Sequence, residues 1–231
     1  MGLSLAFAIV VDKQGERHIL GFELGDGISR RHALRWTDFL RSLRERGLTN
    51  TKLVTSDAHG GLVPSLSRVF SGAAWQRCTV HFPYAPALSA GVRNVLSQMA
   101  DKDKKQVADA PKLIFQQPDY LTVQLYFELV SAAMESRWTK VAEMLWEAKD
   151  DILVWKTFPK EHHRSIHSIN PLVRLNRKFR QREQVVGVFP DRSSVYCLIG
   201  TFLMNVDGDW QYGRRYTAEK GIQNSLILSW K

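Results

Sequence analysis

Asp57 is the first residue in this sequence whose position calls for a chemical role. It follows Leu53, Val54 and Thr55, whose apolar and β-branched side chains favour a short buried strand. Acidic residues at the carboxyl ends of strands in α/β sheets face the crevice where ligands and metals bind. A turn is the structural alternative, because Asp caps helices and the following Gly60-Gly61 pair permits backbone angles that other residues avoid. The stretch by itself leaves a metal site and a turn both open.

Three further side chains near Asp57 have types that bind metals or position substrates. Cys78 and His81 form a C-x-x-H pair, which is half of a zinc-ligand pattern. A convincing second half is absent from the sequence, which favours a structural role for the pair over zinc binding. His59 is suited to positioning substrate or water, and its structural alternative is a hydrogen-bonded loop residue.

A predicted helix beginning at Asn170 combines an apolar stripe with a basic face. Asn170 is the expected cap and Pro171 occupies the first turn. The buried stripe at i, i+3 and i+7 consists of Leu172, Leu175 and Phe179. The opposite face and its flanks carry Val173, Arg174, Arg177, Lys178, Arg180 and Arg182.

The basic side chains of this helix, together with Arg77, form either a solvated face or a contact surface for phosphates. The whole chain has 32 Lys and Arg against 23 Asp and Glu, a formal net charge of +9. That excess favours a polyanionic partner, nucleic acid before membrane. No apolar run reaches transmembrane length, and two cysteines give no disulfide framework. The sequence therefore predicts a cytoplasmic protein that contacts DNA.

The elements that position these residues alternate between strands and helices. Strands are expected at 3–11 and 17–24, joined by a turn in which Asp12 is a turn residue. A helix at 29–46 precedes the strand at 52–56, and a short helix at 62–70 leads to a strand at 73–82. Strand, helix and strand in this order imply a parallel pair in one sheet. Residues 83–158 are mainly helical in pattern, and a last helix starts near Arg192 with Asp191 as its cap.

Five ordered stretches span nearly the whole chain: FLRSLRERGL at 39–48, LVTSDAHGGL at 53–62, WQRCTVHF at 75–82, NPLVRLNRKFRQREQVVGVFP at 170–190 and DWQYGRRY at 209–216. In these stretches the sequence resembles the mutator-type transposases of bacterial insertion sequences. The resemblance implies an α/β, RNase H-like mixed sheet with flanking helices, interrupted by an all-helical insertion. The expected division is 1–82 for the first part of the core, 83–165 for the insertion and 166–231 for the C-terminal helices that complete the core.

The resemblance also implies the chemistry. Family members cut and join DNA ends with two aspartates and a glutamate that hold two Mg²⁺ ions. Asp57 matches the second aspartate and is the expected catalytic and metal-binding residue, with Cys78, His81 and His59 in support. The implied partners are the DNA of the element ends and of the target, and further copies of the chain. No membrane is implied, and the expected location is the nucleoid.

The sequence departs from this family pattern at two catalytic positions. Val173 stands where the family has its glutamate, and the strand that carries the first aspartate is expected before the hairpin, where the sequence begins. The expected consequence is a truncated, inactive copy that does not bind Mg²⁺ productively. The alternative is a non-catalytic DNA-binding or subunit-poisoning protein that interferes with intact transposase. The missing first core strand would leave two sheet edges unpaired, which predicts low solubility or molten behaviour.

Overall fold

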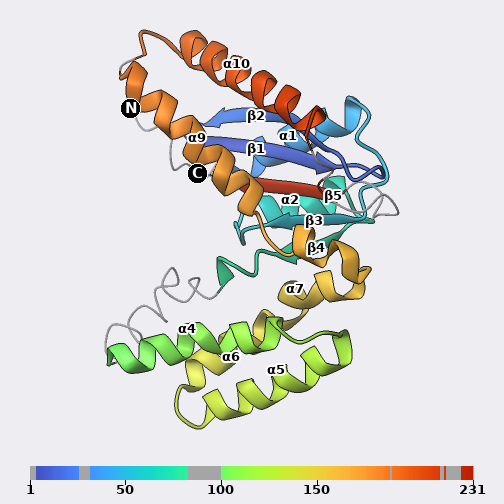
Figure 1. Ribbon diagram of the computed structural model, residues 1–231, viewed down its shortest axis with the longest axis vertical. Coiled ribbons are helices and arrows are strands. Elements are labelled where there is room, and N and C mark those ends of the chain that lie inside the picture. Colours follow the sequence, from blue (N-terminus) through green and yellow to red (C-terminus); the bar gives the residue numbers. More distant parts are fainter. Residues whose placement is uncertain are drawn as a thin grey trace.

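A five-stranded sheet organises the fold in the computed structural model, which describes residues 4–25, 32–82, 100–187, 189–213, 216 and 225–230. The strand order is β2-β1-β5-β3-β4 (Figure 1). In chain order the strands are β1 (Ser4–Val11), β2 (Arg17–Gly25), β3 (Leu53–Ser56), β4 (Ala74–Arg77) and β5 (Ser225–Trp230). The mixed α/β class expected from the sequence is confirmed.

The hairpin of β1 and β2 forms as expected, and its tip explains Asp12. The Asp12 Oδ1 atom accepts hydrogen bonds from the backbone amides of Gln14 and Glu16, each at 2.9 Å. The turn interpretation of Asp12 is therefore confirmed. Behind the turn, β1 is buried on both faces, since Phe7 and Ala8 have no solvent exposure although they point in opposite directions.

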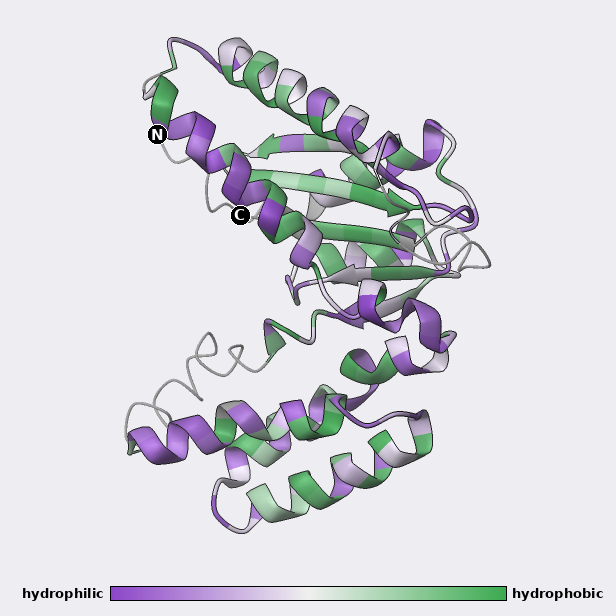
Figure 2. Ribbon diagram, viewed as in Figure 1, coloured by the Kyte–Doolittle hydropathy of each residue, from purple (hydrophilic) through white to green (hydrophobic). Residues whose placement is uncertain are grey.

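Helices cover both faces of the sheet (Figure 1). On one face, α9 (Asn170–Val186) and α10 (Arg192–Gln211) pack against β1 in an apolar cluster that includes Phe7, Leu175 and Phe202. On the other face, α1 (His32–Glu45) and α2 (Leu62–Val69) bury Ala8 and Leu40. Figure 2 shows β1 as a mainly hydrophobic strand and α9 as a mainly hydrophilic helix, which agrees with one buried side of α9 and one exposed side.

The sequence analysis expected no strand between the hairpin and β3, and the position of β5 shows that this expectation was wrong. β5 lies between the hairpin and β3, pairing antiparallel with β1 and parallel with β3. The two edges predicted to be unpaired are therefore paired in this structure. The sequence analysis expected only helices in residues 166–231, so the strand Ser225–Trp230 was missed. Its side chains Leu226, Ile227 and Leu228 are fully buried, which explains why an apolar strand occupies this place.

The parallel pairing of β3 with β4 is confirmed, with Leu53 opposite Ala74 and Ser56 opposite Arg77. The described residues 101–166 are mainly helical, as expected, and Figure 1 shows α4, α5 and α6 grouped outside the sheet. These helices are α4 (Asp101–Phe115), α5 (Tyr120–Glu135) and α6 (Thr139–Glu147), followed by α7 (Lys149–Leu153), the short 3₁₀ turns Val154–Thr157 and Lys160–His162, and α8 (His163–Ile166). Residues 83–99 of the predicted insertion lie outside the described residues.

The group of helices beyond β4 has a core of its own, in which Ile114, Phe127 and Leu145 are buried together. Its outer surface retains large apolar side chains, including Leu121 and Leu129 on α5. Among the described helices, none combines the length and the apolar character needed to cross a membrane.

Candidate metal centre and nucleic-acid interface

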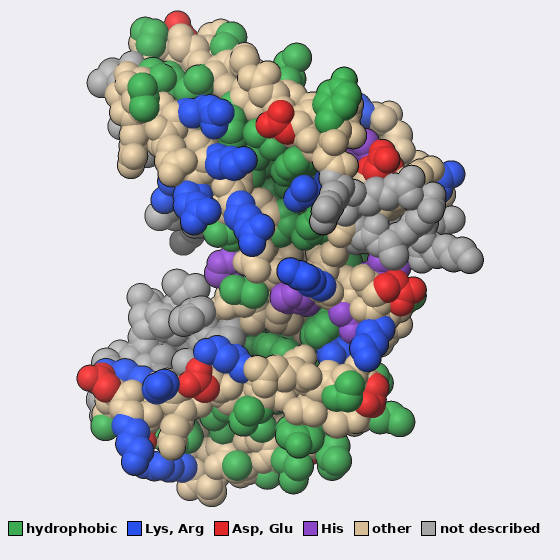
Figure 3. All heavy atoms as spheres, in the orientation of Figure 1, with side chains coloured by type: hydrophobic (Ala, Val, Ile, Leu, Met, Phe, Trp, Pro, Cys, Tyr) green, Lys and Arg blue, Asp and Glu red, His purple; other side chains and the backbone are tan. Residues whose placement is uncertain are grey.

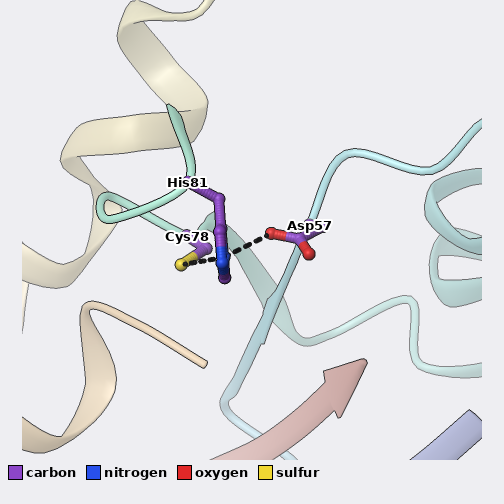
Figure 4. A group of neighbouring side chains, drawn as sticks. All are labelled: Asp57, Cys78 and His81. Carbon is purple, nitrogen blue, oxygen red and sulfur yellow. Dashed lines mark hydrogen bonds and ion pairs between the residues drawn. The ribbon is translucent and has the colours of Figure 1, made fainter. Parts of the chain in front are cut away.

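Asp57 lies directly after the carboxyl end of β3, where the sequence analysis placed it. The neighbouring strand β4 ends beside it, because the backbone amide of Cys78 donates to the carbonyl of Ser56 at 2.8 Å. The turn after Cys78 then brings His81 back toward β3. Figure 4 shows the three side chains of Asp57, Cys78 and His81 converging, with His81 between the other two.

The ring of His81 contacts both of its neighbours through one nitrogen. Nδ1 lies 3.1 Å from Asp57 Oδ1 and 3.3 Å from Cys78 Sγ. The interaction with the Asp57 carboxylate, followed by that with Cys78, raises the pKa of His81 to about 10. Without a metal, His81 is therefore a cation held between a carboxylate and a thiol.

Burial differs among the three side chains. Cys78 is fully buried, whereas Asp57 and His81 are exposed to 42% and 39%. The Asp57 Oδ1 atom itself is shielded from solvent and has no well-directed hydrogen bond, although His81 Nδ1 lies nearby. A shielded carboxylate oxygen without a directed donor is costly unless a cation or a polar group faces it.

The segment that leads into α9, residues 167–169, forms hydrogen bonds with the end of β4. The Thr79 amide donates to the carbonyl of His167 at 3.0 Å, and the Thr79 hydroxyl lies 2.8 Å from His167 Nδ1. The Ile169 amide donates to Cys78 Sγ at 3.5 Å. Because α9 starts immediately after Ile169, the end of β4 and the start of α9 are held in fixed relation. No feature of the sequence had indicated Thr79 or His167 as part of the site.

His59 follows Asp57 by two residues, and Arg77 lies close enough to Asp57 for their charges to interact. The ring nitrogen Nδ1 of His59 accepts a hydrogen bond from the Gly61 amide at 3.2 Å, so His59 helps to shape the start of α2. Arg77 is half-buried at the end of β4, with its guanidinium 5.0 Å from the ring centre of Phe82. Burial lowers the pKa of Arg77, while Asp151 and Asp57 oppose this shift. Arg77 therefore belongs to the surroundings of Asp57 and not to the basic face of α9.

The start of α9 differs in detail from the prediction. Asn170 is the first helical residue, and Ile169 precedes it without a side-chain capping hydrogen bond. The expected stripe of Leu172, Leu175 and Phe179 is buried, as predicted. Val173 is partly buried and packs against the same apolar cluster as that stripe.

The expected pair of Mg²⁺ ions requires clustered carboxylates, because two dications about 3.5–4 Å apart repel each other strongly. The shielded Oδ1 of Asp57 suits a cation. Its neighbours within 4.8 Å, however, are a thiol and an imidazole, and a valine occupies the position expected for glutamate. Mg²⁺ takes oxygen ligands in preference to sulfur and nitrogen. The described donor set therefore does not fit a pair of Mg²⁺ ions.

The exposed side of α9 carries the basic residues that were predicted there. All five basic side chains from 174 to 182 are exposed: Arg174, Arg177, Lys178, Arg180 and Arg182. In Figure 3, Lys and Arg side chains gather over α9 on this face of the molecule. The guanidinium of Arg182 lies 4.6 Å from the ring centre of Phe202, so part of its side chain packs against α10.

A cavity of about 740 Å³ opens beside the first turns of α9, and we refer to it as the cationic cavity. Arg17 of β2 lies in its wall with its guanidinium 4.3 Å from the ring centre of Trp210 and 4.4 Å from that of Tyr216. No acidic side chain is among the lining residues that the structure describes. The basic and aromatic lining residues are Arg17, Arg164, Arg174, Lys178, His167, Trp210 and Tyr216.

The electrostatics of the cationic cavity favour an anionic ligand. Burial lowers the pKa of Arg17 and raises the pKa of Tyr216, but an arginine pKa starts so high that Arg17 keeps its charge at neutral pH. The raised pKa keeps Tyr216 neutral there. The Arg17 guanidinium and the two aromatic rings suit a nucleotide, whose phosphate meets the cations and whose base has a face for stacking. His167 lines the cavity and contacts Thr79, so the cavity adjoins the Asp57 site.

Comparison with known proteins identifies the class. Residues 1–213, which include the sheet strands β1 to β4 and the Asp57 site, match the family described as "Transposase, Mutator family". The protein therefore belongs to the Mutator family of transposases, as the resemblance indicated.

Relatives in several bacteria are similar over most of this chain. The chain is 37% identical over 94% of its length to the transposase for insertion sequence element IS1081 of Mycobacterium tuberculosis. It is 34% identical over 92% of its length to the transposase for IS256 in transposon Tn4001 of Staphylococcus aureus. The matched parts make up 49% and 52% of those two relatives. The chain thus spans about half the length of the curated relatives that it matches.

Proposed function

We propose that this protein acts in DNA transposition as a DNA-binding transposase chain that does not cut DNA by itself. The exposed basic side of α9, continuous with the cationic cavity through Arg174 and Lys178, carries the proposal. Because these side chains neutralise backbone phosphates, the contact gives affinity without reading the base sequence. Related proteins are named as transposases for insertion sequence elements, which fits DNA as the ligand.

The sheet supports an RNase H-like assignment. An antiparallel hairpin lies beside a parallel pair, and Asp57 follows the carboxyl end of a strand of that pair. This is the place where ligands bind in α/β sheets. We assign residues 1–82 and 166–231 to this core and 83–165 to an insertion.

Absence of cutting follows from the donor atoms around Asp57. A carboxylate, a thiol and an imidazole are available there, and Val173 offers no oxygen. Asp57 corresponds to a catalytic carboxylate, and His59 and Arg77 support its surroundings. Mg²⁺ is not bound productively as a pair. A chain that binds DNA and does not cut would also interfere with an intact transposase by occupying its DNA or joining its oligomer, and this is the second candidate function.

The test is the salt dependence of binding to a short duplex of arbitrary sequence, followed by fluorescence anisotropy. If about four phosphates are contacted, the slope of log K against log salt is about −3.6. The double variant Arg177→Gln/Lys178→Gln removes two contacts and brings the slope to about −1.8.

The matched control is Lys102→Gln/Lys105→Gln, which removes the same charge from exposed positions on α4. This control leaves the slope near the value of the unmodified chain. Equal slopes for the two double variants would show that binding depends on net charge alone, and the α9 interface would be rejected. Two unrelated duplexes should bind within a few-fold of each other.

A further inference from the structure

The three side chains at the end of β3 and β4 have the donor types of a zinc site, and the two separations measured from His81 Nδ1 are close to those in such a site. Zn²⁺ takes thiolate, imidazole and carboxylate ligands in tetrahedral geometry, with bonds of about 2.3 Å to sulfur and about 2.0–2.2 Å to nitrogen and oxygen. Such bonds place neighbouring nitrogen and sulfur ligands about 3.5 Å apart, and neighbouring nitrogen and oxygen ligands about 3.4 Å apart. The observed separations are 3.3 Å from His81 Nδ1 to Cys78 Sγ and 3.1 Å from Nδ1 to Asp57 Oδ1.

We propose that Asp57, Cys78 and His81 form a binding site for one Zn²⁺ ion. All three donor atoms lie within 4.8 Å of one another, although they come from the ends of two different strands. A thiolate, a carboxylate and a neutral imidazole carry two negative charges, which balance the charge of the ion. This assignment differs from the pair of Mg²⁺ ions that the family implies, and it is independent of the DNA contact proposed for α9.

The shielded Oδ1 of Asp57 is a second observation that points to a cation. It lies out of solvent and faces the His81 ring at 3.1 Å, an ion pair that shows that this position attracts positive charge. Arg77 interacts electrostatically with Asp57, but its interaction with the carboxylate of Asp151 is the larger of the two. Three protein ligands leave a fourth tetrahedral position for water, as in zinc sites that remain open.

Backbone hydrogen bonds position Cys78 for metal binding. The hydrogen bond from Cys78 to the Ser56 carbonyl fixes the sulfur beside the end of β3, and the Ile169 amide donates to that sulfur. The sulfur that would bind the metal is therefore held in place from two sides by the backbone. Zinc binding would replace the proton that His81 holds, so binding releases protons.

The test uses the full chain, stripped of metal with a chelator and then titrated with Zn²⁺ against a chromophoric competitor. One Zn²⁺ per chain is expected, with at least a tenfold preference over Mg²⁺. Co²⁺ as a probe should give a tetrahedral visible spectrum and a thiolate-to-cobalt band in the near ultraviolet. Absence of that band in the unmodified chain would overturn the proposal without any variant.

Matched variants identify the ligands. Loss of a second-shell partner already costs about 10–100-fold in metal affinity, so Cys78→Ser, His81→Gln and Asp57→Asn should each lose at least that much. Cys197→Ser is the control, because Cys197 is an exposed cysteine on α10. Unchanged affinity in His81→Gln, or equal loss in Cys197→Ser, would reject the site. Circular dichroism of each variant separates ligand loss from misfolding, and an unchanged DNA salt slope in His81→Gln keeps this test separate from that of α9.

Discussion

Ile227 of β5 pairs in parallel register with Thr55 of β3, two residues before Asp57. The same residue pairs with Ile9 of β1 on its other side. A strand near the end of the printed sequence therefore joins the hairpin to the strand that carries the candidate metal site. Removal of this join would separate the sheet into two parts, so the stability of the fold should depend strongly on β5.

Ile227→Ala tests this dependence. Ile227 has no solvent exposure and belongs to the apolar cluster under α9 and α10. We expect a loss of about 2–5 kcal/mol in the free energy of unfolding, because the substitution leaves a cavity in a packed core. Urea unfolding followed by circular dichroism measures it. Leu129→Ala, at a 57% exposed position on α5, should change stability by less than about 0.5 kcal/mol. Non-cooperative unfolding of the unmodified chain would instead support the molten behaviour expected from an open sheet.

Arg17→Gln tests the cationic cavity. Arg17 lies over the rings of Trp210 and Tyr216, away from α9 in the sequence, and offers a guanidinium to a phosphate. We expect a several-fold loss of affinity for single-stranded DNA, corresponding to about 1 kcal/mol. Arg137→Gln is the control, since Arg137 also lies over an aromatic ring, that of Trp138, at 4.8 Å. Equal losses in both variants would show that the cavity makes no special contact.

Val173→Glu tests the account of inactivity. The substitution places a carboxylate at the position that resembles the family glutamate, and Val173→Gln is the uncharged control. We expect Mg²⁺ binding that is weak and depends on Asp57 in the glutamate variant, because Mg²⁺ is commonly bound by one or two carboxylates and water. We expect no nicking of supercoiled DNA by the unmodified chain or by either variant. Nicking by the unmodified chain that disappears in Asp57→Ala would contradict this account.

The free energy of unfolding should depend on pH through His167. Burial lowers the pKa of His167 below 6.5, with smaller contributions from the charges of His163 and Lys156. The unfolded chain therefore binds a proton at a pH where the folded chain does not. The stabilising contribution is complete above the unfolded pKa and is lost as the pH falls through and below it.

Urea unfolding at about pH 7.5 and about pH 5 measures this effect. The unmodified chain should lose more stability on acidification than His167→Gln, whose amide keeps a polar partner for Thr79 without titrating. An identical pH dependence in the two proteins would mean that His167 does not contribute.

The sequence by itself determined the parts of the fold that depend on local pattern. The strand before Asp57 followed from three neighbouring side chains, and the stripe of Leu172, Leu175 and Phe179 followed from helical spacing. The cap at Asp191 was also correct, since its side chain accepts a hydrogen bond from the Ser194 amide at 2.7 Å. The cap expected at Asn170 was wrong by one residue, because a capping residue and a first helical residue have similar local sequences.

Only the tertiary structure decided which distant segments meet. β5 was missed because a short apolar run does not reveal its partners, and its neighbours β1 and β3 come from the other end of the sequence. Cys78 and His81 formed half of a zinc pattern in the sequence, and the third donor came from Asp57 only when β3 and β4 ended side by side. Arg17 gave no local signal, since its contacts with Trp210 and Tyr216 depend on the packing of α10 against β2. Pairing and convergence of this kind are set by long-range packing, which local periodicity does not encode.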